Sequence, residues 1–169
     1  MKIAIMGYSG SGKSTLAQIL AKKHHIPALH LDTVQFLPGW QIRDQSEKER
    51  IVLEFLNTHS QWVIDGNYSK LSFDRRVEEA DFIILLLFNR FACLHRAYRR
   101  YRKFKQGTRP DMAQGCNEKF DFTFMKWILW EGRTKHKQAQ FQQVLTQYSH
   151  KAVVIKNQKQ LNQYLDTIK

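Results

Sequence analysis

The chain has 169 residues, of which 43% are hydrophobic and 25% are charged. This length suffices for one α/β core and is too short for two ordinary domains, so we expect residues 1–169 to form a single domain. The longest apolar run is far shorter than the roughly 20 residues that cross a bilayer, which excludes a membrane-spanning helix. The chain begins with a core-like strand instead of a leader, so we expect a cytoplasmic protein without a membrane partner.

The positive charge is concentrated in one part of the chain. The formal net charge is +12, and residues 90–137, with 13 Lys or Arg and four Asp or Glu, account for +9 of it. Such a segment suits either a nucleic-acid surface or a set of arginines that closes over phosphates, and charge alone does not choose between them. Cys93 and Cys116 lack the number and spacing for a disulfide framework or a zinc site, so we expect two reduced thiols.

The first 15 residues carry the strongest functional signal. An apolar strand, residues 2–6, runs into a glycine-rich turn with the Walker A spacing of Gly7, Gly12, Lys13 and Ser14. Glycines allow successive amide N–H groups to converge on phosphate oxygens, and the helix that follows directs the positive end of its dipole at the same anion. Lys13 would serve the β- and γ-phosphates, and Ser14 a Mg²⁺ ion. The expected nucleotide contacts are Gly7, Ser9, Gly10, Ser11, Gly12, Lys13, Ser14 and Thr15.

Two aspartates stand at the ends of the next two predicted strands. Asp32 follows residues 28–31, and Asp65 follows residues 62–64. The carboxyl ends of parallel strands face the ligand crevice of an open sheet, so both should lie near the glycine-rich turn. Asp65 is expected to be a second Mg²⁺ contact, and Asp32 to hold a Mg²⁺-bound water or to accept a proton from an acceptor hydroxyl. The alternatives are a helix cap for Asp32 and a plain turn for Asp65.

The segment between these aspartates is expected to be irregular from residue 33 to residue 43. Phe36 and Trp40 in this segment either form a substrate wall or pack on the next helix. Asp44 and Glu47 have capping-box spacing, which predicts that a helix begins there. A further short helix is expected near residues 73–79.

Residues 82–88 form an unbroken apolar run, which is typical of a central strand covered on both faces. A basic helix with Arg96, Arg99 and Arg100 follows. Residues 104–121 then contain Gly107, Arg109, Pro110 and Gly115, and we expect a mobile lid there that closes over the transferred group; plain disorder is the alternative. The remaining predicted elements are a long helix over residues 122–148 that carries Arg133 on its lid side, a fifth strand at residues 152–155 and a last amphipathic helix.

With these residues placed, the chain resembles the adenylate-kinase-like branch of the P-loop kinases over nearly its whole length. It is similar in particular to the DNA topology modulation (FlaR-type) proteins in residues 62–68, in Pro38-Gly39-Trp40 and in Arg109-Pro110-Asp111. The resemblance implies an α/β, three-layer P-loop NTPase fold: a five-stranded parallel sheet of order 2-3-1-4-5, helices on both faces and a basic lid. Adenylate kinases continue Asp-Gly with Phe-Pro-Arg, whereas Asn67-Tyr68 stand here, which argues against AMP as acceptor.

We therefore expect a Mg²⁺-dependent phosphotransferase that moves the γ-phosphoryl group of ATP to a small nucleotide- or nucleoside-type acceptor. ATP and Mg²⁺ are the expected cofactors, with Ser14 and Asp65 as metal contacts. The alternative is an ATP-switched nucleic-acid-binding regulator that affects DNA topology, suggested by the aromatic residues within the basic segment. Neither the acceptor nor the oligomeric state follows from the sequence. The side chains to which the kinase interpretation assigns catalysis are Lys13, Asp32, Asp65, Arg99, Arg109 and Arg133.

Overall fold

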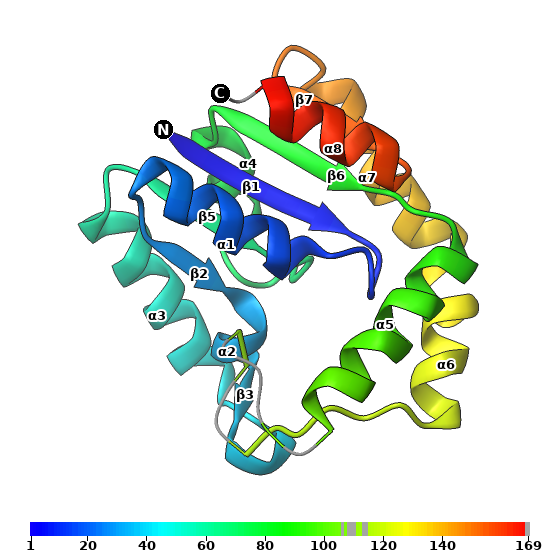
Figure 1. Cartoon of the computed structure of the whole chain (residues 1–169). Coiled ribbons are helices and arrows are strands. Elements are labelled where there is room, and N and C mark those ends of the chain that lie inside the picture. Colours follow the sequence, from blue (N-terminus) through cyan, green and yellow to red (C-terminus); the bar gives the residue numbers. More distant parts are fainter. Residues whose placement is uncertain (106, 108–110, 113–114, 168–169) are drawn as a thin grey trace.

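A five-stranded parallel sheet forms the centre of the computed structural model, in the order β2-β5-β1-β6-β7 (Figure 1). The structure describes residues 1–105, 107, 111–112 and 115–167. Counted within this sheet alone the order is 2-3-1-4-5, as predicted; the labels differ because β3 and β4 form a separate antiparallel hairpin. The strands are β1 (Lys2–Gly7), β2 (Ala28–His30), β3 (Phe36–Leu37), β4 (Gln41–Ile42), β5 (Trp62–Asp65), β6 (Phe82–Leu86) and β7 (Ala152–Ile155).

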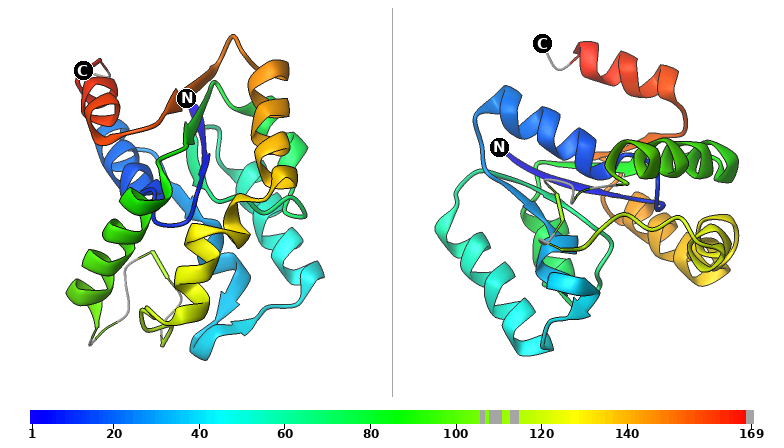
Figure 2. Two further views of the ribbon diagram at one scale, coloured as in Figure 1. Left: turned by 90° about the vertical axis from the view of Figure 1, so that its right-hand side faces the viewer. Right: turned by 60° about the horizontal axis from the view of Figure 1, so that its bottom comes forward.

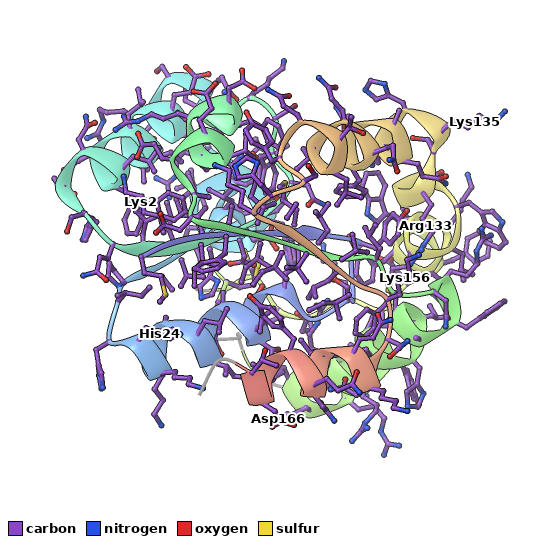
Figure 3. The ribbon with its side chains drawn as sticks, turned by 90° about the horizontal axis from the view of Figure 1, so that it is seen from above. Lys2, His24, Arg133, Lys135, Lys156 and Asp166 are labelled. Carbon is purple, nitrogen blue, oxygen red and sulfur yellow. The ribbon has the colours of Figure 1, made fainter. Side chains whose placement is uncertain are left out.

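Helices cover both faces of this sheet, which confirms the predicted three layers. Viewed from above, α1 and α8 lie on one side of the sheet and α3, α4 and α7 on the other (Figure 3). Alternate residues of β1 pack in opposite directions: Ile3 and Ile5 against the α1 and α8 side, Ala4 and Met6 against the other. The helices are α1 (Lys13–His24), α2 (Leu31–Gln35), α3 (Gln45–Thr58), α4 (Phe73–Glu79), α5 (Arg90–Phe104), α6 (Phe122–Leu129), α7 (Lys135–Gln147) and α8 (Gln158–Thr167).

The apolar run at residues 82–88 forms β6, which lies between β1 and β7. Ile84 and Leu86 pack on the α1 and α8 side, whereas Ile83 and Leu85 pack on the α3, α4 and α7 side. All four are fully buried, as expected for a strand that both layers of helices cover. None of the helices in the described part of the chain is long and apolar enough to span a membrane.

The segment predicted to be irregular, residues 33–43, is instead structured. The end of α2, the two strands of the hairpin and a 3₁₀ turn at Pro38–Trp40 occupy it. Gly39 permits this tight turn, because its φ of 75° lies in the left-handed region that other residues avoid. The prediction of a helix start at Asp44 is confirmed: its carboxylate accepts from the backbone N–H groups of Ser46 and Glu47.

The prediction of one long helix over residues 122–148 is wrong. Helix α6 ends at Leu129, a 3₁₀ turn follows at Glu131–Arg133, and α7 begins after Thr134, whose hydroxyl caps the new helix. The chain bends tightly here, since a Cβ on Gly132 would lie 2.8 Å from the Trp127 carbonyl oxygen. As a result α6 runs beside α5 beyond the carboxyl ends of the strands, while α7 returns to cover the sheet (Figure 1).

Glu79 ties the end of α4 to the start of β1. Its carboxylate accepts from Lys2 Nζ at 2.7 Å and from Arg75, and these hydrogen bonds lower the pKa of Glu79 below its ordinary value of 4.5. A carboxyl group with a lower pKa in the folded state than in the unfolded state stabilises the folded state. This stabilisation is complete when the pH is above the unfolded-state pKa, and it is lost as the pH falls through the folded-state pKa.

We expect Glu79→Gln to lower the free energy of unfolding by at most about 1 kcal/mol at pH 7, because the pair is partly exposed. The difference from wild type should disappear when urea unfolding is repeated well below pH 4.5. Glu54→Gln is the matched control, because the pair between Glu54 and Arg50 is largely exposed. An equal effect of both variants at pH 7 would contradict the prediction.

Candidate functional site

A cleft of about 1740 Å³ lies at the carboxyl ends of the strands. The turn between β1 and α1 forms its floor, and the residues that follow β2 and β5 line it on one side. Helices α3 to α7 and the β3–β4 hairpin contribute the remaining walls. Parallel α/β sheets bind their ligands at this edge, so the cleft is the candidate functional site.

The glycine-rich turn is held in its shape by close packing on β6 and α5. Gly7, Gly10 and Gly12 all have positive φ, of 142°, 78° and 97°. A Cβ on Gly7 would lie 2.3 Å from the Leu86 carbonyl oxygen, and one on Gly10 would lie 2.5 Å from that of Cys93. Only glycine fits such positions, so the backbone itself forms the lining that a phosphate group would meet.

Lys13 bends back over this turn from the first position of α1. Its Nζ donates to the carbonyl oxygens of Gly7 and Tyr8, at 3.1 Å each. Burial lowers the pKa of Lys13, and the negative charges of Asp32 and Asp65 act in the opposite direction. The ammonium group therefore lies within electrostatic reach of both carboxylates and over the cradle that would hold phosphates.

Ser14 and Asp65 form a pair of oxygen ligands beside the turn. Ser14 Oγ donates to Asp65 Oδ2 at 2.8 Å, and Asp65 is only 4% exposed. Hydroxyl and carboxylate oxygens suit Mg²⁺, which is commonly bound by one or two protein ligands together with substrate phosphates and water. This donor set fits the predicted metal. Asp65 therefore does more than end a strand at a turn.

His30 is a member of this group that the sequence did not reveal. Its Nδ1 hydrogen-bonds to Asp65 Oδ1, because β2 and β5 pair in a register that sets His30 opposite Asp65. Burial alone would lower the pKa of His30, but the hydrogen bond and the charge of Asp65 outweigh it and the pKa is raised. His30 thus occupies one carboxylate oxygen and leaves Oδ2 directed at Ser14.

Asp32 lies in the first turn of α2 and lines the cleft. Its Oδ1 accepts from the Tyr68 hydroxyl at 2.7 Å, and it is not the cap of α2, since that position belongs to His30. Burial and then the charge of Asp32 raise the pKa of Tyr68, so the phenol stays a hydrogen-bond donor at neutral pH. Tyr68 therefore fixes the direction of the Asp32 carboxylate.

The turn that follows β5 is tied to the glycine-rich turn by Asn67. Its side-chain amide accepts from the Gly7 N–H at 3.0 Å and donates to the Gly7 carbonyl at 2.7 Å. Buried Arg76 donates hydrogen bonds to the carbonyl oxygens of Leu71, Gly66 and Tyr68 and so stabilises the same turn. Burial lowers the pKa of Arg76 to about 10. Asn67 could be noticed in the sequence only as a departure from the adenylate kinase pattern.

The arginines assigned to catalysis occupy different environments. Arg99 is exposed and lines the cleft, whereas Arg109 lies outside the described residues. Arg133 donates to the carbonyl oxygens of Ile128 and Phe88 and to Cys93 Sγ. Its guanidinium lies 3.8 Å from the centre of the Tyr8 ring (Figure 3 labels it). Arg133 therefore contacts Tyr8 of the glycine-rich turn and does not line the cleft.

Two further side chains contact the same turn from α5 and α6. Arg96 stacks on Phe88 with its guanidinium 4.7 Å from the ring centre, and its Nη2 lies 2.8 Å from where a Gly12 Cβ would be. Trp127 donates from Nε1 to Ser9 Oγ at 3.1 Å. Spacing along the basic helix indicated a ridge of arginines, but only the packed structure shows which of them meets the turn.

The described part of the predicted lid rests on the β3–β4 hairpin. Cys116 donates from Sγ to the Leu37 carbonyl at 3.3 Å, and Trp40 donates from Nε1 to the Asn117 carbonyl at 3.2 Å. Both views of Figure 2 show the segment that leads into α6 passing beside the hairpin. This contact closes one side of the cleft. Cys93 and Cys116 are both buried free thiols, as predicted.

One comparison with a solved structure agrees with this architecture. The chain is similar to TT1252 from Thermus thermophilus, with a TM-score of 0.58 and 14% identity over 99% of this chain and 95% of that one. Shikimate kinase from Bacteroides thetaiotaomicron matches with a TM-score of 0.47 and 16% identity over 99% and 95% of the two chains. At 14% identity, the likeness to TT1252 shows the fold alone. No protein-family model and no curated protein matches the chain.

The tight packing of the glycine-rich turn can be tested with two glycines of similar conformation. Gly10 (φ 78°) faces the Cys93 carbonyl, whereas Gly39 (φ 75°) has nothing within 4 Å of a Cβ. Both Gly→Ala variants carry the strain of positive φ, about 1–2 kcal/mol, but only Gly10→Ala adds a clash. Titration with a non-hydrolysable ATP analogue and Mg²⁺ should show at least a tenfold loss of affinity in Gly10→Ala. Gly39→Ala should stay within twofold of wild type, and equal affinities would contradict the packing argument.

Proposed function

We propose that the protein is a Mg²⁺-dependent kinase that transfers the γ-phosphoryl group of ATP to a hydroxyl group of a small acceptor. The observation that best supports it is the convergence of Lys13, the Ser14–Asp65 pair and Asp32 on one cleft, from the ends of three neighbouring strands. Phosphoryl transfer requires positioning and neutralisation of charge more than covalent catalysis, and these side chains provide both.

The donor side consists of the glycine-rich turn and the residues beside it. The turn amides would hold the phosphates, and Lys13 would exchange the carbonyl oxygens of Gly7 and Tyr8 for phosphate oxygens. Ser14 and Asp65 would hold Mg²⁺, which neutralises charge on the β- and γ-phosphates when bound. His30 would keep the Asp65 carboxylate in the orientation that this requires.

On the acceptor side, Asp32 would receive the proton. The acceptor oxygen attacks the γ-phosphorus, the bond from that phosphorus to the β–γ bridging oxygen breaks, and ADP leaves. The proton of the acceptor hydroxyl passes to Asp32, whose Oδ1 is held by Tyr68. No described residue donates a hydrogen bond to the other oxygen of Asp32, which suits contact with the acceptor.

Arg99 is the described arginine that best suits the stabilisation of charge on the transferred group, because it is exposed and lines the cleft. Arg109 is proposed for the same role on the sequence alone. Arg133 would act by holding Tyr8 in the glycine-rich turn. The likeness to the DNA topology modulation (FlaR-type) proteins rests on the sequence motifs, and the proposed reaction needs no contact with DNA.

The proposal predicts that Lys13→Ala lowers the rate of ADP formation from Mg²⁺–ATP by several orders of magnitude, because the phosphates lose their cation. The melting temperature should change little, since among the described residues Lys13 bonds only to the carbonyl groups of Gly7 and Tyr8. Lys22→Ala, at an exposed position in the last turn of α1, is the control and should keep the wild-type rate. A folded Lys13→Ala variant with unchanged turnover would refute the kinase assignment.

The second candidate function is binding of nucleic acid by the basic segment. It is supported by four exposed cations at the end of α5: Arg99, Arg102, Lys103 and Lys105. The rings of Tyr98 and Tyr101 lie 5.3 Å and 6.0 Å from that of Phe120, although Tyr98 remains 43% exposed. Arg100 pairs with buried Glu118. Some of these groups thus make contacts within the protein, and a kinase accounts for the exposed ones with fewer assumptions, so this function ranks below the kinase.

A DNA-binding measurement separates the two candidates. We expect no saturable binding of a short fluorescent DNA duplex at about 50 mM salt, where contacts to phosphates are strong. A nucleic-acid-binding regulator would instead bind tightly there, lose affinity steeply as salt rises, and retain binding in Lys13→Ala. Fluorescence anisotropy with wild type and Lys13→Ala at two salt concentrations gives the answer.

A further inference from the structure

Lys48 is a buried cation in the wall of the cleft that the proposed reaction does not use. It lies in α3, lines the cleft and is only 6% exposed. Its Nζ donates to Gln35 Oε1 at 3.2 Å, and no described carboxylate forms an ion pair with it. A buried ammonium group with only a neutral amide partner destabilises a protein, because it loses hydration without gaining an opposite charge.

The place of Lys48 in its helix adds to this penalty. Asp44 caps α3, and Lys48 is the fourth residue after it, with its N–H bonded to the Asp44 carbonyl. The N-terminal end of a helix carries partial positive charge, which favours anions and disfavours a lysine. A lysine at this position therefore does not stabilise the helix. Residues that disagree with local stability in this way are expected where a side chain binds a ligand.

The partner of Lys48 lies close to the residue that would accept the proton. Gln35 and Asp32 are three residues apart in α2, so their side chains leave the helix on neighbouring positions about 5–6 Å apart. Both line the cleft. Gln35 thus joins the ammonium group of Lys48 to the helix that carries Asp32, and all three residues line the same cleft.

Aromatic side chains form the wall next to these polar groups. Phe36 and Trp40 line the cleft and make an edge-to-face contact, with their ring centres 5.2 Å apart. The hydrogen bond from Trp40 to Asn117 fixes this wall to the segment before α6. The acceptor side of the cleft therefore offers a carboxylate, an ammonium group and an apolar surface for a small molecule.

We infer that Lys48 binds an anionic group of the phosphoryl acceptor, so that the acceptor is a small acid that also carries a hydroxyl group. The hydroxyl would meet Asp32, the carboxylate or phosphate would meet Lys48, and the body of the molecule would lie against Phe36 and Trp40. A lysine acts as a compact point charge and serves either anion. The inference rests on the proposed kinase function, because Asp32 takes its role from it.

The test compares hydroxyl-bearing acids with their neutral counterparts in the presence of Mg²⁺ and a non-hydrolysable ATP analogue. Glycerate and gluconate form the carboxylate arm, glycerol 3-phosphate and glucose 6-phosphate the phosphate arm, and glycerol and glucose the neutral set. Calorimetric titration of wild type should show at least one acid binding at least tenfold more tightly than its neutral counterpart. Which arm binds identifies the anion.

Variants of Lys48 assign that preference to its ammonium group. Lys48→Met keeps the apolar stem and should lose the tenfold preference, whereas Lys48→Arg should keep it within about threefold. Lys22→Met removes an equal charge from an exposed position and should leave the preference unchanged. An acid preference that survives in Lys48→Met, or equal binding of acids and neutral compounds to wild type, would refute the inference, as would no binding in either arm.

Two further measurements distinguish a ligand-binding Lys48 from a structural one and from a failed kinase assignment. Without ligand, Lys48→Met should raise the melting temperature by about 2–4 °C, because a buried unpaired charge is removed. A lower melting temperature would instead mark Lys48 as a structural residue and refute the inference. Failure of the ATP analogue to bind wild type would refute the proposed function itself, whereas analogue binding without an acid preference refutes only the role of Lys48.

Discussion

The parallel register of β2, β5 and β1 determines where the polar groups at the ends of these strands lie. Pairing of His30 with Asp65 and of Ile5 with Asp65 brings the carboxyl ends of three strands level with one another. From this alignment follow the hydrogen bond from Ser14 to Asp65 and the two bonds between Asn67 and Gly7. Because side chains alternate along a strand, a shift of one residue in either pairing would direct these groups to the wrong face.

Most buried polar groups of the site are compensated by specific partners. Asp65 has Ser14 and His30, and the guanidinium of Arg76 has three backbone carbonyl groups. Such pairing offsets the loss of hydration and fixes the directions of these groups, which a reaction that depends on positioning requires. Lys48 stands apart because its described partner is a single neutral amide. This contrast is the reason that we assign it to a ligand.

The lysines and arginines of the basic segment, residues 90–137, have several different roles, and net charge alone does not distinguish these roles. Arg96 and Arg133 hold the glycine-rich turn from two sides, and Arg100 joins α5 to Glu118 in the segment before α6. Arg99 and its exposed neighbours at the end of α5 remain beside the cleft. Part of the charge is therefore structural, whereas most of the described lysines and arginines of the segment are exposed.

The order of the strands was expected from the resemblance to the P-loop kinases. The sequence by itself determined the glycine-rich turn, the apolar run of β6 and the positions of Asp32 and Asp65 at strand ends. These features depend on local backbone preference and on continuous apolar runs, which neighbouring residues encode. Only the tertiary structure decided the bond from His30 to Asp65, the break of the predicted long helix at Trp130 and the direction of Arg133. It also placed Lys48 against Gln35. Each of these depends on strand register or on the packing of side chains far apart in the chain, and no local pattern records either.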